Sequence, residues 1–182
     1  MTEARHSDPL WRSVLMILGF VGLIAICARI AIPFYPVPIT LQTWAVLVTG
    51  ALSGPRRGVG AVALYLAMAA VGLPVLANGA GGLSAVTGGT AGYLIAFPAA
   101  AFIAGWAAEQ GRLGVSLQGF VILLIAHAVT LALGVAWLIL SIGLDPIRAV
   151  QVGATPFLIG AVIKSGLVLA TLWIWRRWRA RG

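Results

Sequence analysis

The chain has 182 residues, of which 61% are apolar and only 9% are Asp, Glu, Lys or Arg. Soluble domains carry about 25% charged residues, so this composition excludes a soluble enzyme, a disordered tail and a disulfide scaffold. The net charge of +8 comes from arginines at the ends of apolar runs, where they orient membrane helices, and we expect no nucleic-acid binding. We therefore predict a single all-α integral membrane domain over residues 1–182, in the cytoplasmic (inner) membrane of a bacterium.

Six apolar runs follow one another along the chain, separated by clusters of proline and glycine that end helices. The first run is expected to remain in the mature protein, because no Ala-x-Ala cleavage site follows it. We predict six transmembrane helices. They cover residues 13–32, 39–53, 59–72, 91–108, 115–140 and 156–175.

Basic residues collect on one side of this six-helix arrangement. Of the twelve Lys and Arg residues, nine fall at the two termini and in the loops after the second and fourth helices. These nine are Arg5, Arg12, Arg56, Arg57, Arg112, Arg176, Arg177, Arg179 and Arg181. Cytoplasmic loops carry the excess of basic residues, so we expect both termini in the cytoplasm.

Two uncharged loops, 33–38 and 73–90, fall on the opposite side. The second is rich in glycine and nearly as apolar as the helices. Irregular backbone at membrane depth is tolerated where it is buried in protein or lines a cavity. We expect these loops to cap a ligand cavity, and a flexible exposed connector is the alternative.

Lys164 is the residue that most clearly indicates a function. It lies about eight residues into the last predicted helix, at a depth of ~12 Å, and no acidic residue occurs in a predicted helix to neutralise it. A cation at this depth is a functional candidate, here a counter-ion for an anionic ligand. The alternative is a lysine that extends to the membrane surface. Arg29 either lines the same pocket or points away from it.

Other polar and aromatic residues fall near the same level. Asn78 offers a donor and an acceptor to a ligand amide or urea, or is a turn residue beside glycine. Gln42 and Thr43 open the second helix, as ligand contacts or as caps. Trp44 and Tyr93 stack on a ring of the ligand, or anchor helices at the membrane interface.

Residues for catalysis are scarce. No His-x-x-x-His pair and no pair of membrane carboxylates occurs, so metal or acid–base chemistry is not expected. Ser84 with His127 is a distant match to an intramembrane hydrolase, but Ser84 lies in an outer loop, and His127 is expected to be a hydrogen-bonded interior residue. We predict no enzyme activity, no cofactor and no metal.

The run Pro-Val-Pro-Ile-Thr-Leu-Gln-Thr at 36–43 resembles the signature of the BioY family, the substrate-binding component of biotin ECF transporters. The glycine blocks at 79–83 and 88–92 match later blocks of that family in order. The resemblance implies six helices, a biotin pocket near the outer face and no catalysis. It also implies that Asn78 binds the ureido ring of biotin and that Lys164 holds its carboxylate.

Two departures from the family pattern matter. Members often carry an acidic residue three positions before the lysine, as an acceptor for the urea N–H groups, and this chain has Ala161 there. The predicted helix 13–32 lacks a strict Ala-x-x-x-Ala stripe, because its small residues recur every three positions. Two modes of action therefore stay open: docking on a coupling protein with two ATPases, and action alone or by self-association. A component for another small carboxylate vitamin is the alternative to biotin.

Overall fold

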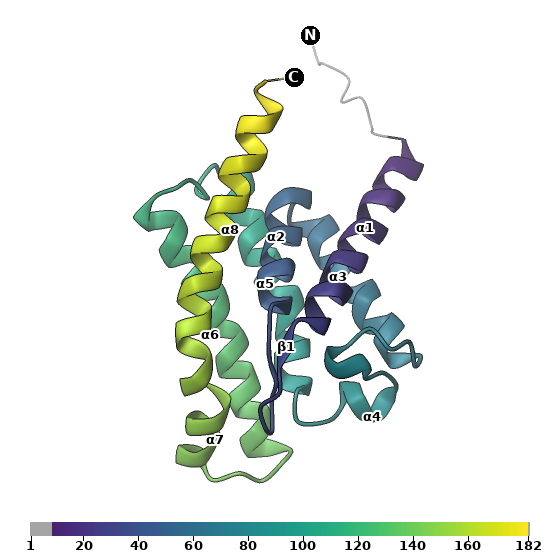
Figure 1. The fold of residues 1–182 in the computed structure, drawn as a ribbon, viewed down its shortest axis with the longest axis vertical. Helices are drawn as coiled ribbons and strands as arrows, with labels where there is room; N and C mark the ends of the chain where they lie inside the picture. The colour runs from purple at the N-terminus through teal and green to yellow at the C-terminus, as the bar shows by residue number, and fades with distance from the viewer. Residues whose placement is uncertain (1–8, 182) are drawn as a thin grey trace.

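The computed structural model describes residues 9–181 as a bundle of helices in which the start of α1 and the end of α8 lie at the same end (Figure 1). Among these residues the six longer helices are α1 (Leu10–Arg29), α2 (Gln42–Ser53), α3 (Pro55–Ala70), α5 (Ala91–Glu109), α6 (Leu117–Leu140) and α8 (Leu158–Arg179). Helices α1, α5 and α6 and the continuous segment Pro146–Arg179 are long and apolar enough to cross a membrane. Since α2 and α3 have only 12 and 16 residues, six full spans are not confirmed, whereas the helical membrane fold is.

Large apolar side chains are exposed on the outer faces of the long helices. Examples are Leu15 on α1, Ile125 on α6 and Ile163 on α8. Such surfaces are unfavourable in water and suit the hydrocarbon core of a bilayer.

The first two predicted helices are shorter than expected at the ends that face each other. Residues 13–32 and 39–53 were predicted as helical, but β1 (Ala31–Ile32) pairs antiparallel with β2 (Ile39–Thr40). The prolines between these strands cannot continue a helix and favour extended backbone before them. The chain therefore forms a short ribbon, and α2 begins only at Gln42.

Helix α3 begins four residues earlier than predicted, directly after α2. Gly54, with φ of +82°, ends α2, and Pro55 is the first residue of α3. Proline suits this position because the first N–H of a helix has no partner within it. Gly105 of α5 packs on the Gly54–Pro55 backbone, where a Cβ would lie 2.7 Å from the Gly54 carbonyl carbon.

Several short elements were not predicted. They are η1 (Ala77–Gly79), α4 (Leu83–Val86), α7 (Pro146–Gly153) and η2 (Thr155–Phe157). The side chain of Asp145 caps α7 by accepting from Ile147 N at 2.9 Å and Arg148 N at 3.2 Å. The Asp-Pro pair at 145–146 is a recognisable start signal for a helix. The last helix runs on to Arg179, because its arginines are stabilised by the negative C-terminal end of the helix dipole.

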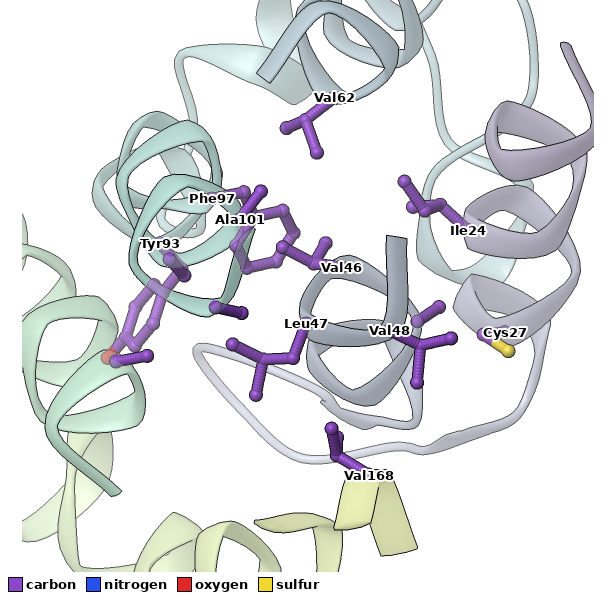
Figure 2. Packing of buried hydrophobic residues seen from close by; sticks show 14 of the residues in the cluster. Ile24, Cys27, Val46, Leu47, Val48, Val62, Tyr93, Phe97, Ala101 and Val168 are labelled. Atoms are coloured by element: carbon purple, nitrogen blue, oxygen red, sulfur yellow. The ribbon is translucent and has the colours of Figure 1, made fainter. Parts of the chain in front are cut away.

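The core lies around α2, which packs against α1, α3, α5 and α8. Figure 2 shows Val46, Leu47 and Val48 of α2 among side chains from neighbouring helices. These neighbours are Ile24 and Cys27 of α1, Val62 of α3, Phe97 and Ala101 of α5, and Val168 of α8. Packing of this density holds the helices in fixed relative positions and gives the site a rigid base.

The two ends of the bundle differ in character. A groove at the C-terminal ends of α2, α5 and α8 is lined by polar groups that include Glu109, Arg176 and Arg179. Near it, Arg112 stacks on Trp106 at 5.0 Å and Arg177 on Trp173 at 4.2 Å. The N-terminal ends of the same three helices lie at the other end, where the irregular segments 30–41 and 71–90 carry the β1 and α4 labels in Figure 1. Arg5, part of the topology prediction, lies outside the described residues.

Candidate functional site

A cavity of about 360 Å³ lies at the N-terminal ends of α2, α5 and α8. One side, the helical wall, consists of Gln42, Thr43, Tyr93, Leu94, Phe97, His127, Thr130, Leu131, Phe157, Ala161 and Lys164. The other side, the loop wall, consists of Pro36, Val37, Pro38, Thr40, Leu76, Ala77, Asn78, Ala80, Ser84, Ala85, Gly88, Gly89 and Thr90. Both uncharged loops singled out in the sequence contribute to it. The volume is that of a site for one small organic molecule.

Lys164 points its ammonium group toward α2. It is the seventh residue of α8, half-buried, and its Nζ donates a hydrogen bond of 3.0 Å to Thr43 Oγ1. None of the lining residues in the described part of the chain carries a carboxylate. The cation therefore has a neutral partner and retains donors for an anion, since an ammonium has three N–H groups.

Asn78 lies in the loop wall in a left-handed conformation, with φ of 56° and ψ of 18°. The turn that contains it is closed by a hydrogen bond of 3.0 Å from Leu76 N to Ala80 O. Asparagine is one of the few residues that adopt this backbone readily. Asn78 is thus a turn residue, as the alternative had it, and also a cavity-lining residue. Its amide has no hydrogen-bond partner in the described chain, which leaves it available to a ligand.

Arg29 does not line the cavity. From the last turn of α1 its guanidinium donates to the Pro74 carbonyl, and a Cβ at Gly79 would lie 2.8 Å from its Nη1. Arg29 therefore contacts the loop that carries Asn78 without lining the cavity itself. Of the two positions left open for Arg29, the structure shows the one outside the pocket.

Gln42 lines the cavity, and the nitrogen of its amide is engaged. Gln42 Nε2 donates to the Tyr65 hydroxyl, which in turn donates to Val75 O at 3.1 Å. This chain of hydrogen bonds ties the start of α2 to the loop wall through α3. Thr40 Oγ1 accepts from Gln42 N at 3.3 Å, but the N-cap of α2 is Leu41 and no side chain caps this helix.

The two predicted aromatic residues have different positions. Tyr93 lines the cavity with its ring and donates its hydroxyl hydrogen to Gly153 O at 2.7 Å. Its ring lies 6.0 Å from that of Phe157. Trp44 is not among the lining residues, because one position after Thr43 a side chain is rotated by about 100° around the helix. Its Nε1 is buried without a hydrogen-bond partner within residues 9–181.

His127 and Thr130 of α6 were not predicted as site residues, yet both line the cavity and both are buried. His127 Nδ1 lies 3.0 Å from Leu123 O, as expected for a hydrogen-bonded interior residue. Its Nε2 has no partner in the part of the chain described. The sequence contains a pattern that could have indicated both residues. They are polar residues three positions apart in an apolar helix, and that spacing places them on one face.

Ser84 also lines the cavity, from α4. The structure shows no hydrogen bond between the Ser84 hydroxyl and His127 within the described residues, where the imidazole bonds to Leu123 and Ser165. Residues 9–181 contain no cluster of three or more His, Cys, Asp or Glu suited to a metal ion.

Comparisons with known proteins agree with one another. Residues 1–181 match the model of the BioY family. A probable biotin transporter BioY of Pyrococcus horikoshii is 33% identical over 85% of this chain and 90% of its own length. The biotin transporter BioY of Rhodobacter capsulatus is 37% identical over 90% of this chain and 89% of its own. A crystal structure of the S-component for biotin from an ECF-type ABC transporter superimposes with a TM-score of 0.75 at 30% identity, covering 100% of this chain and 96% of that one.

Proposed function

The chain belongs to the BioY family, and we propose that it is the membrane component that captures biotin for uptake. It is a multi-pass protein of the cytoplasmic membrane. Because the solved relative is a component of an ECF-type ABC transporter, an energising module is among its partners, and lipid surrounds it. Both termini face the cytoplasm, with the cavity open to the outside, since most arginines at helix ends, among them Arg176 and Arg179, lie at the end opposite the cavity.

The cavity carries the proposal because its chemistry matches the groups of biotin. Biotin has a carboxylate at the end of an apolar chain and a urea fused to a thioether ring. Lys164 supplies the cation for the carboxylate, and an ammonium–carboxylate contact is worth about 1.5–3 kcal/mol. Asn78 supplies a donor and an acceptor for the urea.

The apolar part of the ligand packs between the two walls. Tyr93, Phe97 and Phe157 present aromatic surface from the helical wall, and Val37 and Leu76 present aliphatic surface from the loop wall. Burial of apolar ligand surface contributes about 25 cal/mol per Å². The fixed aromatic rings lower the entropy lost on binding.

The BioY relatives are transporters, and we propose that this chain catalyses no reaction. The support is chemical: the Ser84 hydroxyl has no base bonded to it among residues 9–181, and none of the described lining residues is a carboxylate. A Ser84→Ala variant should take up biotin at the rate of the native protein. Loss of uptake together with loss of a hydrolytic product would favour the hydrolase instead.

The test of the function is uptake of radiolabelled biotin by cells that cannot make it. The native chain should support uptake, and a tenfold excess of other small carboxylate vitamins should not compete. Co-expression of energising proteins tests whether the chain works alone. Mass spectrometry of ligand carried through purification should find biotin, and a different carboxylate vitamin there would contradict the assignment.

A further inference from the structure

His127 lines the cavity and carries one ring nitrogen without a hydrogen-bond partner among the described residues. The side chain is 5% exposed and lines the cavity from α6. Its Nε2 is buried and has no hydrogen-bond partner within residues 9–181. Buried polar atoms without partners are rare, because each costs free energy, so this atom calls for a partner that comes from outside the chain.

The tautomer of His127 follows from its other nitrogen. Nδ1 lies 3.0 Å from Leu123 O, a carbonyl that can only accept. Nδ1 therefore carries a hydrogen and donates it, and Ser165 Oγ at 3.4 Å is compatible with this assignment. With no carboxylate among the described lining residues and the Lys164 cation in the same cavity, a second buried cation would be unpaired, which is costly. His127 is thus neutral, and its Nε2 carries a lone pair.

Thr43 Oγ1 on the helical wall accepts from Lys164. Gln42 and Tyr93 donate through Nε2 and the hydroxyl group, so Gln42 Oε1 is the other acceptor to weigh beside His127. Ala161 lies one helical turn before Lys164, where the resemblance would place an acidic side chain, and offers no acceptor. A ligand N–H that lies against α6 has the lone pair of His127 as its acceptor, whereas one that lies against α2 has Gln42 Oε1.

We propose that His127 Nε2 accepts a hydrogen bond from a ureido N–H of biotin, in place of the carboxylate that Ala161 lacks. This inference rests on the proposed function, because it needs a urea in the cavity. The urea is then held from both walls, by the Asn78 amide from the loops and by the imidazole from α6. His127 becomes a specificity residue for ligands that carry an N–H donor.

Two matched variants separate this role from a structural one. Asparagine places its amide near the position of Nδ1 and keeps a donor for Leu123 O, but has no atom at the position of Nε2. Glutamine reaches the position of Nε2 with a carbonyl oxygen. We expect His127→Asn to lose about 5- to 150-fold in biotin affinity and His127→Gln to lose much less. The reverse order would show that the bond to Leu123 is what matters and would overturn the inference.

A ligand series adds a second readout. The native protein should bind biotin more tightly than biotin methylated at one of its two ureido nitrogens, and His127→Asn should lose that discrimination. If His127→Asn retains the discrimination in full, the inference is wrong. If the native protein binds no biotin at all, the proposed function itself fails. Calorimetry on the native chain therefore distinguishes failure of the proposed function from failure of the His127 inference.

Should both variants fail to fold, the unsubstituted imidazole can be observed directly. The chain has two histidines, His6 and His127, so a His6→Ala variant labelled with 15N-histidine reports on His127 alone. We expect a neutral ring with hydrogen on Nδ1, and a change in the Nε2 resonance when biotin is added. A protonated ring, or an Nε2 resonance that biotin leaves unchanged, would overturn the inference.

Discussion

The two walls of the cavity differ in how the rest of the protein holds them in place. The helical wall is backed by a close-packed core, and its polar groups project from helices that this core packs together. The loop wall is part of segments 30–41 and 71–90, which have little regular structure and are tied to the helices by a few hydrogen bonds. These are Arg29 to Pro74, Tyr65 to Val75, Gly82 to Ala69 and Trp137 to Gly88.

The helical wall suits the binding of a charged group, and the loop wall suits the entry of a ligand. A cation such as Lys164 is tolerated where rigid neighbours keep a partner within reach, here Thr43 at 3.0 Å. A segment that must admit a ligand needs few contacts, because regions of low local stability open most readily. We therefore expect substitutions in the helical wall to alter stability or charge selectivity, and substitutions in the loop wall to alter fit.

The largest expected effect is on the packing behind the helical wall. Gly134 of α6 lies against the Tyr93 ring, and a Cβ there would overlap the ring. Gly134→Leu should therefore destabilise the protein by about 3 kcal/mol or more, seen as a lower Tm in detergent together with lost biotin binding.

The matched control for this substitution is Gly166→Leu, at a position where a Cβ would meet nothing within 4 Å. It should leave the Tm and the affinity near native values. Equal destabilisation by the two variants would mean that the α5–α6 contact does not support the site.

The next effect concerns the loop wall. Asn78→Ala removes the amide and should weaken biotin binding by roughly 1–3 kcal/mol, measured by calorimetry. Part of this loss is backbone strain, because alanine disfavours a φ of 56°. Asn78→Gly keeps the backbone free of strain and lacks the amide, so it should show most of the same loss. Native affinity in Asn78→Gly would remove the amide from the site.

The smallest effect is expected at a loop anchor. Arg29→Met breaks the bond to Pro74 and should weaken binding by about 0.5–1.5 kcal/mol, with faster hydrogen exchange in residues 74–80. Because Arg29 holds the loop and lies outside the cavity lining, biotin and biotin amide should lose equally. A loss confined to biotin would place Arg29 at the carboxylate.

Much of this arrangement was predictable from the sequence, for physical reasons. Apolar runs of helical length mark α5, α6 and α8, and a lone lysine or asparagine in an apolar chain is costly enough to indicate a site. The ends of helices near proline were not predictable, because strand pairing of 31–32 with 39–40 is a tertiary contact.

The rotation of each helix about its axis was the other missing information. Thr43 faces the cavity and Trp44 does not, although they are adjacent in the chain. His127 becomes a lining residue only once α6 is packed against α8. The sequence left two positions open for Arg29 for a related reason: α1 ends three residues before the predicted end, and the guanidinium bonds to the Pro74 carbonyl.

The central claim is that this cavity binds biotin with Lys164 at the carboxylate. The direct measurement is the affinity of biotin, biotin amide and biotinol for the native chain and for Lys164→Ala. We predict a loss of about ten- to a hundredfold for biotin and a much smaller loss for the two uncharged ligands, because only the acid gains from the cation. Equal losses for all three ligands would contradict the claim and leave Lys164 a structural residue.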